Sequence, residues 1–139
     1  MAELTIKHDE LTAEEFIQLW QSVWDGAPSL EQTQLALKNT LIRLSVFDGE
    51  TIVGMARAIG DKGLCYYIKD VVVRPEWQGK GIGRMMIDEL LRFINENGTA
   101  DTNIAVELCA MPDKIPFYER FGFKANEAQR LRLMKNVTR

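Results

Sequence analysis

Near its start the chain carries apolar residues at the spacing of an α-helix. Phe16, Leu19 and Val23 recur every three or four positions among polar residues, which predicts a helix with one buried face. Thr12 stands where a capping side chain belongs, with a glutamate three residues later, as in a capping box. A second short helix is predicted after Ser29, another residue type that caps helices.

The middle of the chain changes to the pattern of β-strands. Residues 41–47, 51–59 and 64–74 are rich in apolar and β-branched side chains, and glycine-containing turns separate them. Asp48-Gly49 is a typical hairpin turn. Because such short turns join antiparallel neighbours, these segments predict a meander of three antiparallel strands.

The last part of the chain alternates between helix and strand. A long helix is predicted for residues 84–97, a strand for 104–108, a short helix after Asp113, and a last strand around Leu131 and Leu133. The element order is ααβββαβαβ, which predicts an α+β (mixed α/β) fold with helices flanking a mostly antiparallel, twisted sheet. No repeat or linker interrupts the sequence, so we expect a single domain over residues 1–139.

Composition narrows the classes of protein to consider. The 139 residues are 46% hydrophobic and 27% charged, which is typical of a folded soluble domain. A formal net charge of −3 argues against a nucleic-acid partner. No apolar run approaches the ~20 residues of a membrane helix, and the N-terminal residues lack the pattern of a secretory signal. We therefore expect a cytoplasmic protein with no membrane partner.

Few residues suit metal binding. The only histidine, His8, and the two cysteines, Cys65 and Cys109, lie far apart in the sequence and lack the spacing of a ligand cluster. No metal site is expected. Both cysteines are expected to be buried, unreactive thiols in strands, because free cysteine is among the most buried residue types.

A glycine-rich loop lies between the third predicted strand and the long helix. Glycines at 79, 81 and 83 lack a Cβ, so the backbone there can adopt positive φ and approach a ligand closely. The free N–H groups and the dipole of the following helix form a site suited to phosphate. Lys80 and Arg84 add positive charge on either side.

Three phosphate-binding patterns can be compared with this loop. A P-loop needs serine or threonine after its lysine, but Gly81 follows Lys80. The G-x-G-x-x-G fingerprint of dinucleotide-binding proteins fits from neither Gly79 nor Gly81. The pattern Q/R-x-x-G-x-G/A is matched from Gln78 onward. A turn that merely connects two elements stays an alternative.

Two segments resemble a known family. The run DVVVRPEWQGKGIG (residues 70–83) resembles the acetyl-CoA-binding motif of the GCN5-related N-acetyltransferases (GNAT), and PFYERFGF (116–123) resembles their second signature. The two motifs occur in the family's order, and the predicted element order matches the family over the whole chain. The resemblance implies a GNAT-like fold and acetyl-CoA as the acyl donor.

The resemblance also implies where the coenzyme lies. Strand 64–74 would splay from strand 103–109, and the pantetheine arm would lie in the resulting cleft, hydrogen-bonded to the backbone at Val71 and Val73. The pyrophosphate would rest on the amides of residues 79–84. The implied coenzyme-binding residues are Val71, Val72, Val73, Gln78, Gly79, Lys80, Gly81, Ile82, Gly83 and Arg84.

The chemistry follows from the thioester. An amine must lose a proton to attack, the oxyanion needs a donor such as a backbone N–H near Val71, and the leaving thiolate needs an acid. By similarity to the family, Tyr118 is that acid. Asp70, Glu107, a water chain or no dedicated base are alternatives for the base. Met111 stands seven residues before Tyr118, where the family often has an asparagine, and so departs from the family's pattern.

The sequence thus predicts an N-acetyltransferase that transfers an acetyl group from acetyl-CoA to a primary amine, small molecule or peptide, by direct attack in a ternary complex. A non-catalytic acyl-CoA-binding sensor and an adaptor without coenzyme are the alternatives, because function resides in the site and not in the fold. A homodimer is a further expectation from the resemblance, since family members commonly dimerise.

Overall fold

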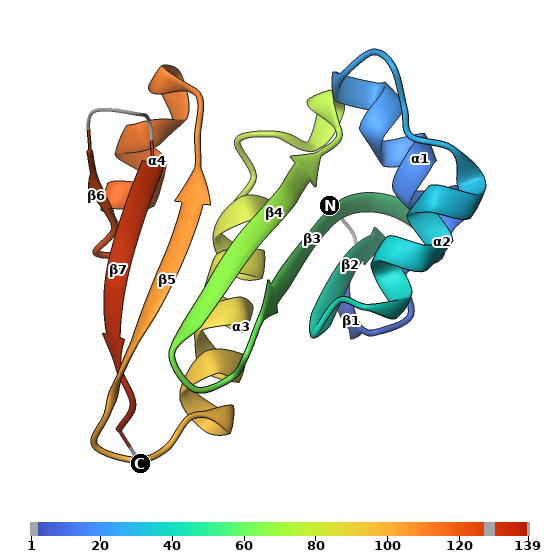
Figure 1. The fold of residues 1–139 in the computed structure, drawn as a ribbon. Helices are drawn as coiled ribbons and strands as arrows, with labels where there is room; N and C mark the ends of the chain where they lie inside the picture. The colour runs from blue at the N-terminus through green and yellow to red at the C-terminus, as the bar shows by residue number, and fades with distance from the viewer. Residues whose placement is uncertain (1–2, 127–129, 139) are drawn as a thin grey trace. The chain divides into compact units, whose positions relative to one another are not determined.

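The computed structural model describes residues 3–126 and 130–138. The described residues contain seven strands and four α-helices (Figure 1). The strands are β1 (Leu4–His8), β2 (Ile42–Asp48), β3 (Thr51–Gly60), β4 (Cys65–Val73), β5 (Asn103–Cys109), β6 (Lys124–Ala125) and β7 (Arg130–Asn136). The α-helices are α1 (Ala13–Val23), α2 (Leu30–Lys38), α3 (Ile82–Asn97) and α4 (Ile115–Glu119), and short 3₁₀ helices span Pro75–Trp77 and Pro112–Lys114.

The strands form one mixed sheet. They are hydrogen-bonded in the order β1-β2-β3-β4-β5-β7-β6. β4 and β5 run parallel, with α3 as the crossover between them, whereas β1–β2, β2–β3, β5–β7 and β6–β7 are antiparallel. The predicted α+β class with a mostly antiparallel sheet flanked by helices is confirmed.

The predicted order ααβββαβαβ was incomplete at both ends. It lacked β1, which is only five residues long and forms a strand by pairing with β2, from Leu4 opposite Asp48 to His8 opposite Leu44. It also lacked the two-residue strand β6, which pairs with β7. β1 depends on a partner more than thirty positions away, and β6 is only two residues long, so no local alternation marks either strand.

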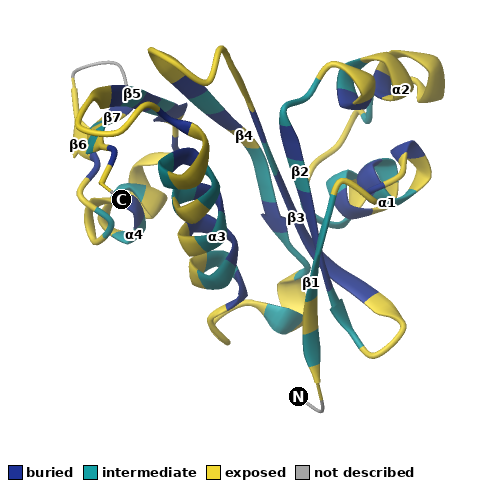
Figure 2. Ribbon diagram, turned by 90° about the horizontal axis from the view of Figure 1, so that it is seen from below, coloured by how far each residue is buried: buried dark blue, intermediate teal, exposed yellow. Residues whose placement is uncertain are grey.

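The chain divides into two compact units. The first contains residues 1–58 and 70–90, and the second contains 59–69 and 91–139. In the first unit, α1 turns its buried stripe toward a core that includes Phe16, Leu19, Met55 and Val72 (Figure 2). A capping box starts α1 as predicted, because Thr12 Oγ1 accepts the Glu15 amide at 3.1 Å. The single-domain organisation stays a prediction.

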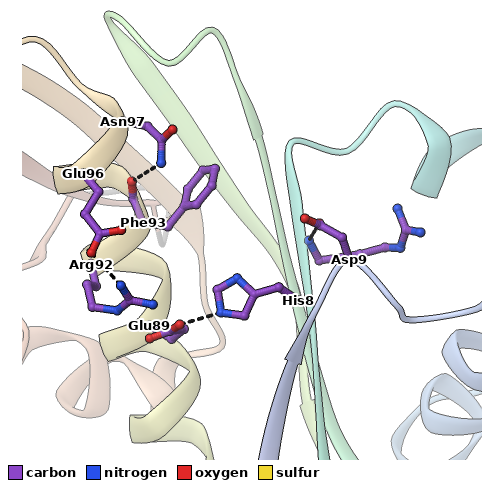
Figure 3. Close-up of polar contacts among 8 residues, drawn as sticks. His8, Asp9, Glu89, Arg92, Phe93, Glu96 and Asn97 are labelled. Atoms are coloured by element: carbon purple, nitrogen blue, oxygen red, sulfur yellow. Dashed lines mark hydrogen bonds and ion pairs between the residues drawn. The ribbon is translucent and has the colours of Figure 1, made fainter.

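One polar contact in the first unit joins the N-terminal strand to the long helix. His8, on β1, lies 2.5 Å from a carboxylate oxygen of Glu89 on α3 (Figure 3). The next residue, Asp9, accepts the Arg43 amide at 3.1 Å and donates its own amide to the Arg43 carbonyl at 2.7 Å. These contacts attach the end of β1 to α3 on one side and to β2 on the other, which explains how so short a strand is ordered.

In the second unit, β5, β7 and β6 lie side by side (Figure 1). Ile104, Val106 and Leu108 alternate into the core as the sequence predicted. The prediction of buried cysteines is wrong: Cys65 and Cys109 are both exposed. They lie at the first position of β4 and the last of β5, on the opposite face from the buried neighbours. Among the described residues, no helix combines the length and apolar character that crossing a bilayer requires.

Candidate functional site

The glycine-rich loop has the backbone geometry that its composition predicted. Gly79 and Gly81 have φ angles of +78° and +86°, in the left-handed region that favours glycine. A Cβ built on either residue would meet no atom within 4 Å, so both face open space. The loop therefore exposes bare backbone on one side, and a bulky ligand group can approach it without displacing protein atoms.

The same loop begins the long helix. The Met85 amide donates to the Gly81 carbonyl at 3.0 Å, which is the first bond of α3. The amides of Ile82, Gly83 and Arg84 precede that bond, so they are the N–H groups that a helix leaves for an external acceptor. Together with the positive end of the helix dipole, they suit an anion such as a diphosphate. The helix starts two residues earlier than predicted, which brings Ile82 and Gly83 into its first turn.

Two side-chain hydrogen bonds hold the entry to the loop. Trp77 donates from Nε1 to Asp48 Oδ2 at 3.0 Å, and Gln78 donates from Nε2 to the Val73 carbonyl at 3.0 Å. Gln78, the first residue of the matched pattern, thus ties the loop back to the end of β4. Lys80 is exposed, and the Arg84 side chain is 74% exposed beside Asp88 at 3.9 Å, so both cations are free to turn toward an anion.

The end of β4 leads into this loop in the first unit. Val72 is buried in the core with α1 residues, whereas Val71 and Val73 are half-buried. Because the Val72 side chain is committed to the core, this residue can serve a ligand only through its backbone. The Arg74 amide donates to the Val53 carbonyl at 2.8 Å, which fixes the last part of β4 against β3.

Asp70, one of the two candidate bases, is already engaged by a cation. Its Oδ2 accepts from Arg57 Nε at 2.7 Å, and both side chains are largely buried. Asp70 also has a φ of +55°, an unusual conformation inside a strand. Sequence reasoning missed Arg57, because its pairing with Asp70 depends on how β3 and β4 align.

Tyr118 lies in the second unit on α4. It is 8% exposed and packs edge-on against Phe117 and Phe123, with ring centroids 4.9 and 6.0 Å away. Burial raises the pKa of Tyr118 to about 12. The phenol is therefore fully protonated at neutral pH, which is the state that a proton donor needs.

Glu107, the other candidate base, is on β5 in the same unit. Its Oε2 accepts from Arg132 Nη2 at 3.0 Å and from Nε at 3.2 Å, so this carboxylate also has a cationic partner. Beside it, Tyr67 donates to Cys109 Sγ at 3.1 Å. This hydrogen bond, followed by burial, raises the pKa of Tyr67. Sequence reasoning missed the Tyr67–Cys109 pair, which only the parallel pairing of β4 with β5 brings together.

The structure groups the predicted residues in two sets. The first unit carries the candidates from Asp70 to Arg84, and the second unit carries Glu107 and Tyr118. Among the described residues, no three side chains of the metal-binding types cluster together. The first unit thus holds an amide-lined loop suited to an anion, and the second holds a protonated, buried phenol. A loop of this kind at a helix N-terminus is typical of proteins that bind a phosphate-bearing ligand.

This class of protein agrees with what comparison with known proteins shows. The family described as the acetyltransferase (GNAT) family matches residues 8–123. That match covers most of the chain, so the chain belongs to the GNAT family, as the two sequence motifs predicted.

Individual relatives agree. The chain is 35% identical over 114 residues to an uncharacterized N-acetyltransferase, ycf52, of Pyropia yezoensis; the alignment covers 78% of this chain and 63% of that protein. The chain thus spans less than two thirds of that relative's length. A crystal structure of a probable acetyltransferase from meticillin-resistant Staphylococcus aureus matches with a TM-score of 0.81 and 25% identity, over 90% of this chain and 92% of that one.

A further solved structure extends the agreement in fold. It is a GNAT family acetyltransferase from Brucella melitensis in complex with acetyl-CoA, with a TM-score of 0.70 and 20% identity, over 100% of this chain and 92% of that chain. At this identity the likeness concerns the fold alone.

Proposed function

We propose that this chain is an N-acetyltransferase that takes the acetyl group of acetyl-CoA and gives it to a primary amine by direct attack in a ternary complex. The observation that carries the proposal is the loop from Gly79 to Gly81, where two left-handed glycines face open space at the start of α3. Membership of the GNAT family supports the same donor. The acceptor is a small-molecule or peptide amine.

The coenzyme would be held mainly by backbone groups. The diphosphate would accept hydrogen bonds from the amides at the start of α3, and Lys80 and Arg84 would balance its charge. The pantetheine arm would pair with the backbone at Val71 and Val73, whose strand ends at the loop. Such binding needs space at Gly79 and Gly81 more than any particular side chain.

The reaction balances as follows. The neutral amine nitrogen attacks the thioester carbon, the C–N bond forms, and the carbonyl oxygen becomes an oxyanion that the amide near Val71 stabilises. The C–S bond then breaks, the nitrogen loses one proton and the sulfur gains one. The products are the N-acetyl amine and CoA with a free thiol.

Tyr118 would carry the proton to sulfur. A phenol with a pKa of about 12 is a weaker acid than a thiol of pKa ~8.5, so full transfer from Tyr118 alone is uphill. The transfer must therefore be coupled to the proton that the amine gives up, which returns to the phenol through a base or a water chain. Glu107 and Asp70 are the carboxylate candidates for that base, although each is paired with an arginine.

Coenzyme binding is tested by calorimetry with Gly81→Ala. Because its Cβ meets open space, this change costs the fold about 1–2 kcal/mol for the left-handed conformation, yet it places a methyl group on the surface that the diphosphate would approach. Gly49→Ala is the matched control: Gly49 has a φ of +61° and equally open surroundings, and it lies in the β2–β3 turn beside Asp48, which bonds Trp77 at the entry to the loop, so the variant also reports indirect effects on the loop.

We expect at least tenfold weaker acetyl-CoA binding in Gly81→Ala and wild-type binding in Gly49→Ala. Equal binding in all three proteins would contradict the proposed site. Turnover is then measured as CoA thiol released with a panel of primary amines. Saturable acetyl-CoA binding without release of thiol for any amine would contradict the transferase and leave the acyl-CoA sensor.

A further inference from the structure

The strand that leads into the glycine-rich loop contains one left-handed backbone position in its interior, which we call the β4 kink. Asp70 lies within β4, yet its φ of +55° is in the left-handed region, which residues other than glycine seldom occupy. A left-handed residue inside a strand is typical of a β-bulge, which bends the strand and re-aims the groups that follow it. The group that follows directly is the amide of Val71.

Arg57 holds the residue at the kink. Its Nε donates to Asp70 Oδ2 at 2.7 Å, and the two side chains are only 15% and 10% exposed. An ion pair shielded from water in this way depends on both partners, because removal of one leaves the other charge buried and unpaired. The contact is made by the side chain of the β4 residue whose own backbone is left-handed, so it acts directly on the kink.

The same guanidinium reaches the helical layer. Arg57 Nη1 donates to Thr40 Oγ1 at 3.1 Å, and Thr40 Oγ1 in turn donates to the Ala36 carbonyl of α2 at 2.8 Å. Arg57 therefore donates to two elements: Nε to Asp70 on β4, and Nη1 to Thr40, which lies just beyond the end of α2. The planar fork of the guanidinium fixes the angle between these contacts, which a lysine would not do.

From this network we infer that Arg57 is a positioning residue for acetyl transfer, which acts through Asp70 to hold the β4 kink that aims the Val71 amide. The inference rests on the proposed function, in which that amide stabilises the oxyanion. It also assigns Asp70 a structural role in place of the general base: the carboxylate is bound by Arg57 and fixed at the kink.

The kinetic test compares Arg57→Met with Arg43→Met. Arg43 is the matched control because it lies directly opposite Arg57 on β2 and is also a half-buried arginine, but its hydrogen bonds go to the Leu11 and Leu37 carbonyls and not to Asp70. For Arg57→Met we expect kcat to fall 10- to 100-fold with less than a threefold change in the KM for acetyl-CoA. For Arg43→Met, adjusted for the folded fraction, we expect kcat within threefold of wild type.

Three further variants separate positioning from base catalysis. Asp70→Asn should lower kcat as Arg57→Met does, and the double variant should be no slower than either, because both remove the same support. The pH dependence of kcat should keep its shape in Asp70→Asn. Loss of the acidic limb of that profile in Asp70→Asn, with wild-type kcat in Arg57→Met, would show that Asp70 is the base and overturn the inference. Arg57→Lys should recover part of the rate.

A structural readout does not depend on turnover. The Val71 amide resonance and its hydrogen exchange should change in Arg57→Met and Asp70→Asn but not in Arg43→Met. An unchanged Val71 amide in a folded Arg57→Met protein would overturn the inference even if the enzyme is active. Absence of thiol release by wild type with every amine would instead refute the proposed function, and with it the catalytic role of Arg57, while the amide signal would still report whether Arg57 holds the kink.

Discussion

Replacement of Tyr118 by phenylalanine tests the environment of the proposed acid without reference to any substrate. Burial raises the pKa of this phenol to about 12, from ~10 in an unfolded chain. The folded state therefore keeps its proton at alkaline pH where the unfolded state loses it. By linkage, the contribution of Tyr118 to stability is intact below pH ~10 and is lost as the pH rises toward 12.

The size of the effect follows from the two pKa values. With ~10 unfolded and about 12 folded, the free energy of unfolding falls by about 1.4 kcal/mol at pH ~11 and by ~2.7 kcal/mol once both states are ionised. Tyr118→Phe removes the titrating group and keeps the ring, which packs against Phe123. As the pH rises, the free energy of unfolding of Tyr118→Phe should therefore increase relative to that of wild type, by about 1.4 kcal/mol at pH ~11.

The measurement is urea unfolding followed by tryptophan fluorescence at several pH values between 8 and 11. Phe123→Leu is the control, because it alters the same buried cluster without a titrating group, so its difference from wild type should not depend on pH. A constant difference between wild type and Tyr118→Phe up to pH ~11 would refute the reasoning. Tyr118 would then ionise like an exposed phenol, and the case for a buried proton donor would lose its physical basis.

Three further changes test local features. Ser45→Ala should leave stability unchanged or raise it by up to about 1 kcal/mol in thermal denaturation, because this buried hydroxyl has no hydrogen-bond partner among the described residues; a clear loss would reveal a partner. Gly98→Ala should cost about 1–3 kcal/mol, since its Cβ would lie 2.6 and 2.8 Å from two core side chains, whereas Gly63→Ala, with no neighbour closer than 3.9 Å, should cost far less. Hydrogen bonds from the backbone of the β3–β4 turn lower the pKa of Asp61, so the protection of the amides in that turn, relative to their intrinsic exchange rates, should fall as pH drops below ~4, and Asp61→Asn should abolish this pH dependence.

The parts of the fold that the sequence predicted are those that local chemistry decides. The capping box at Thr12, the hairpin at Gly49 and the break at Pro75 depend on residues a few positions apart, and the structure has each of them. The glycine loop belongs to this group, because Gly79 and Gly81 are required by their own backbone angles.

The parts that sequence reasoning missed depend on residues that meet only in the folded chain. β1 is ordered by pairing with β2 and by the contact of His8 with Glu89, 81 positions away. The left-handed conformation of Asp70 sits in a run of β-branched residues that reads as a regular strand, and its partner Arg57 comes from another strand. No pattern within a short window contains these pairs.

The same distinction explains why the sequence predicts a site for the acyl donor but does not predict which group removes the proton of the amine. A diphosphate binds to backbone amides that no Cβ atom shields, so glycines just before a helix predict its site. Proton transfer depends on neighbours that meet only in the fold: burial raises the pKa of Tyr118, Asp70 is ion-paired with Arg57, and Glu107 is ion-paired with Arg132. Two carboxylates that looked equivalent as bases in the sequence are both ion-paired with arginines in the fold. The next candidate for proton removal is therefore ordered water at the amine, a role that no single side-chain replacement would abolish.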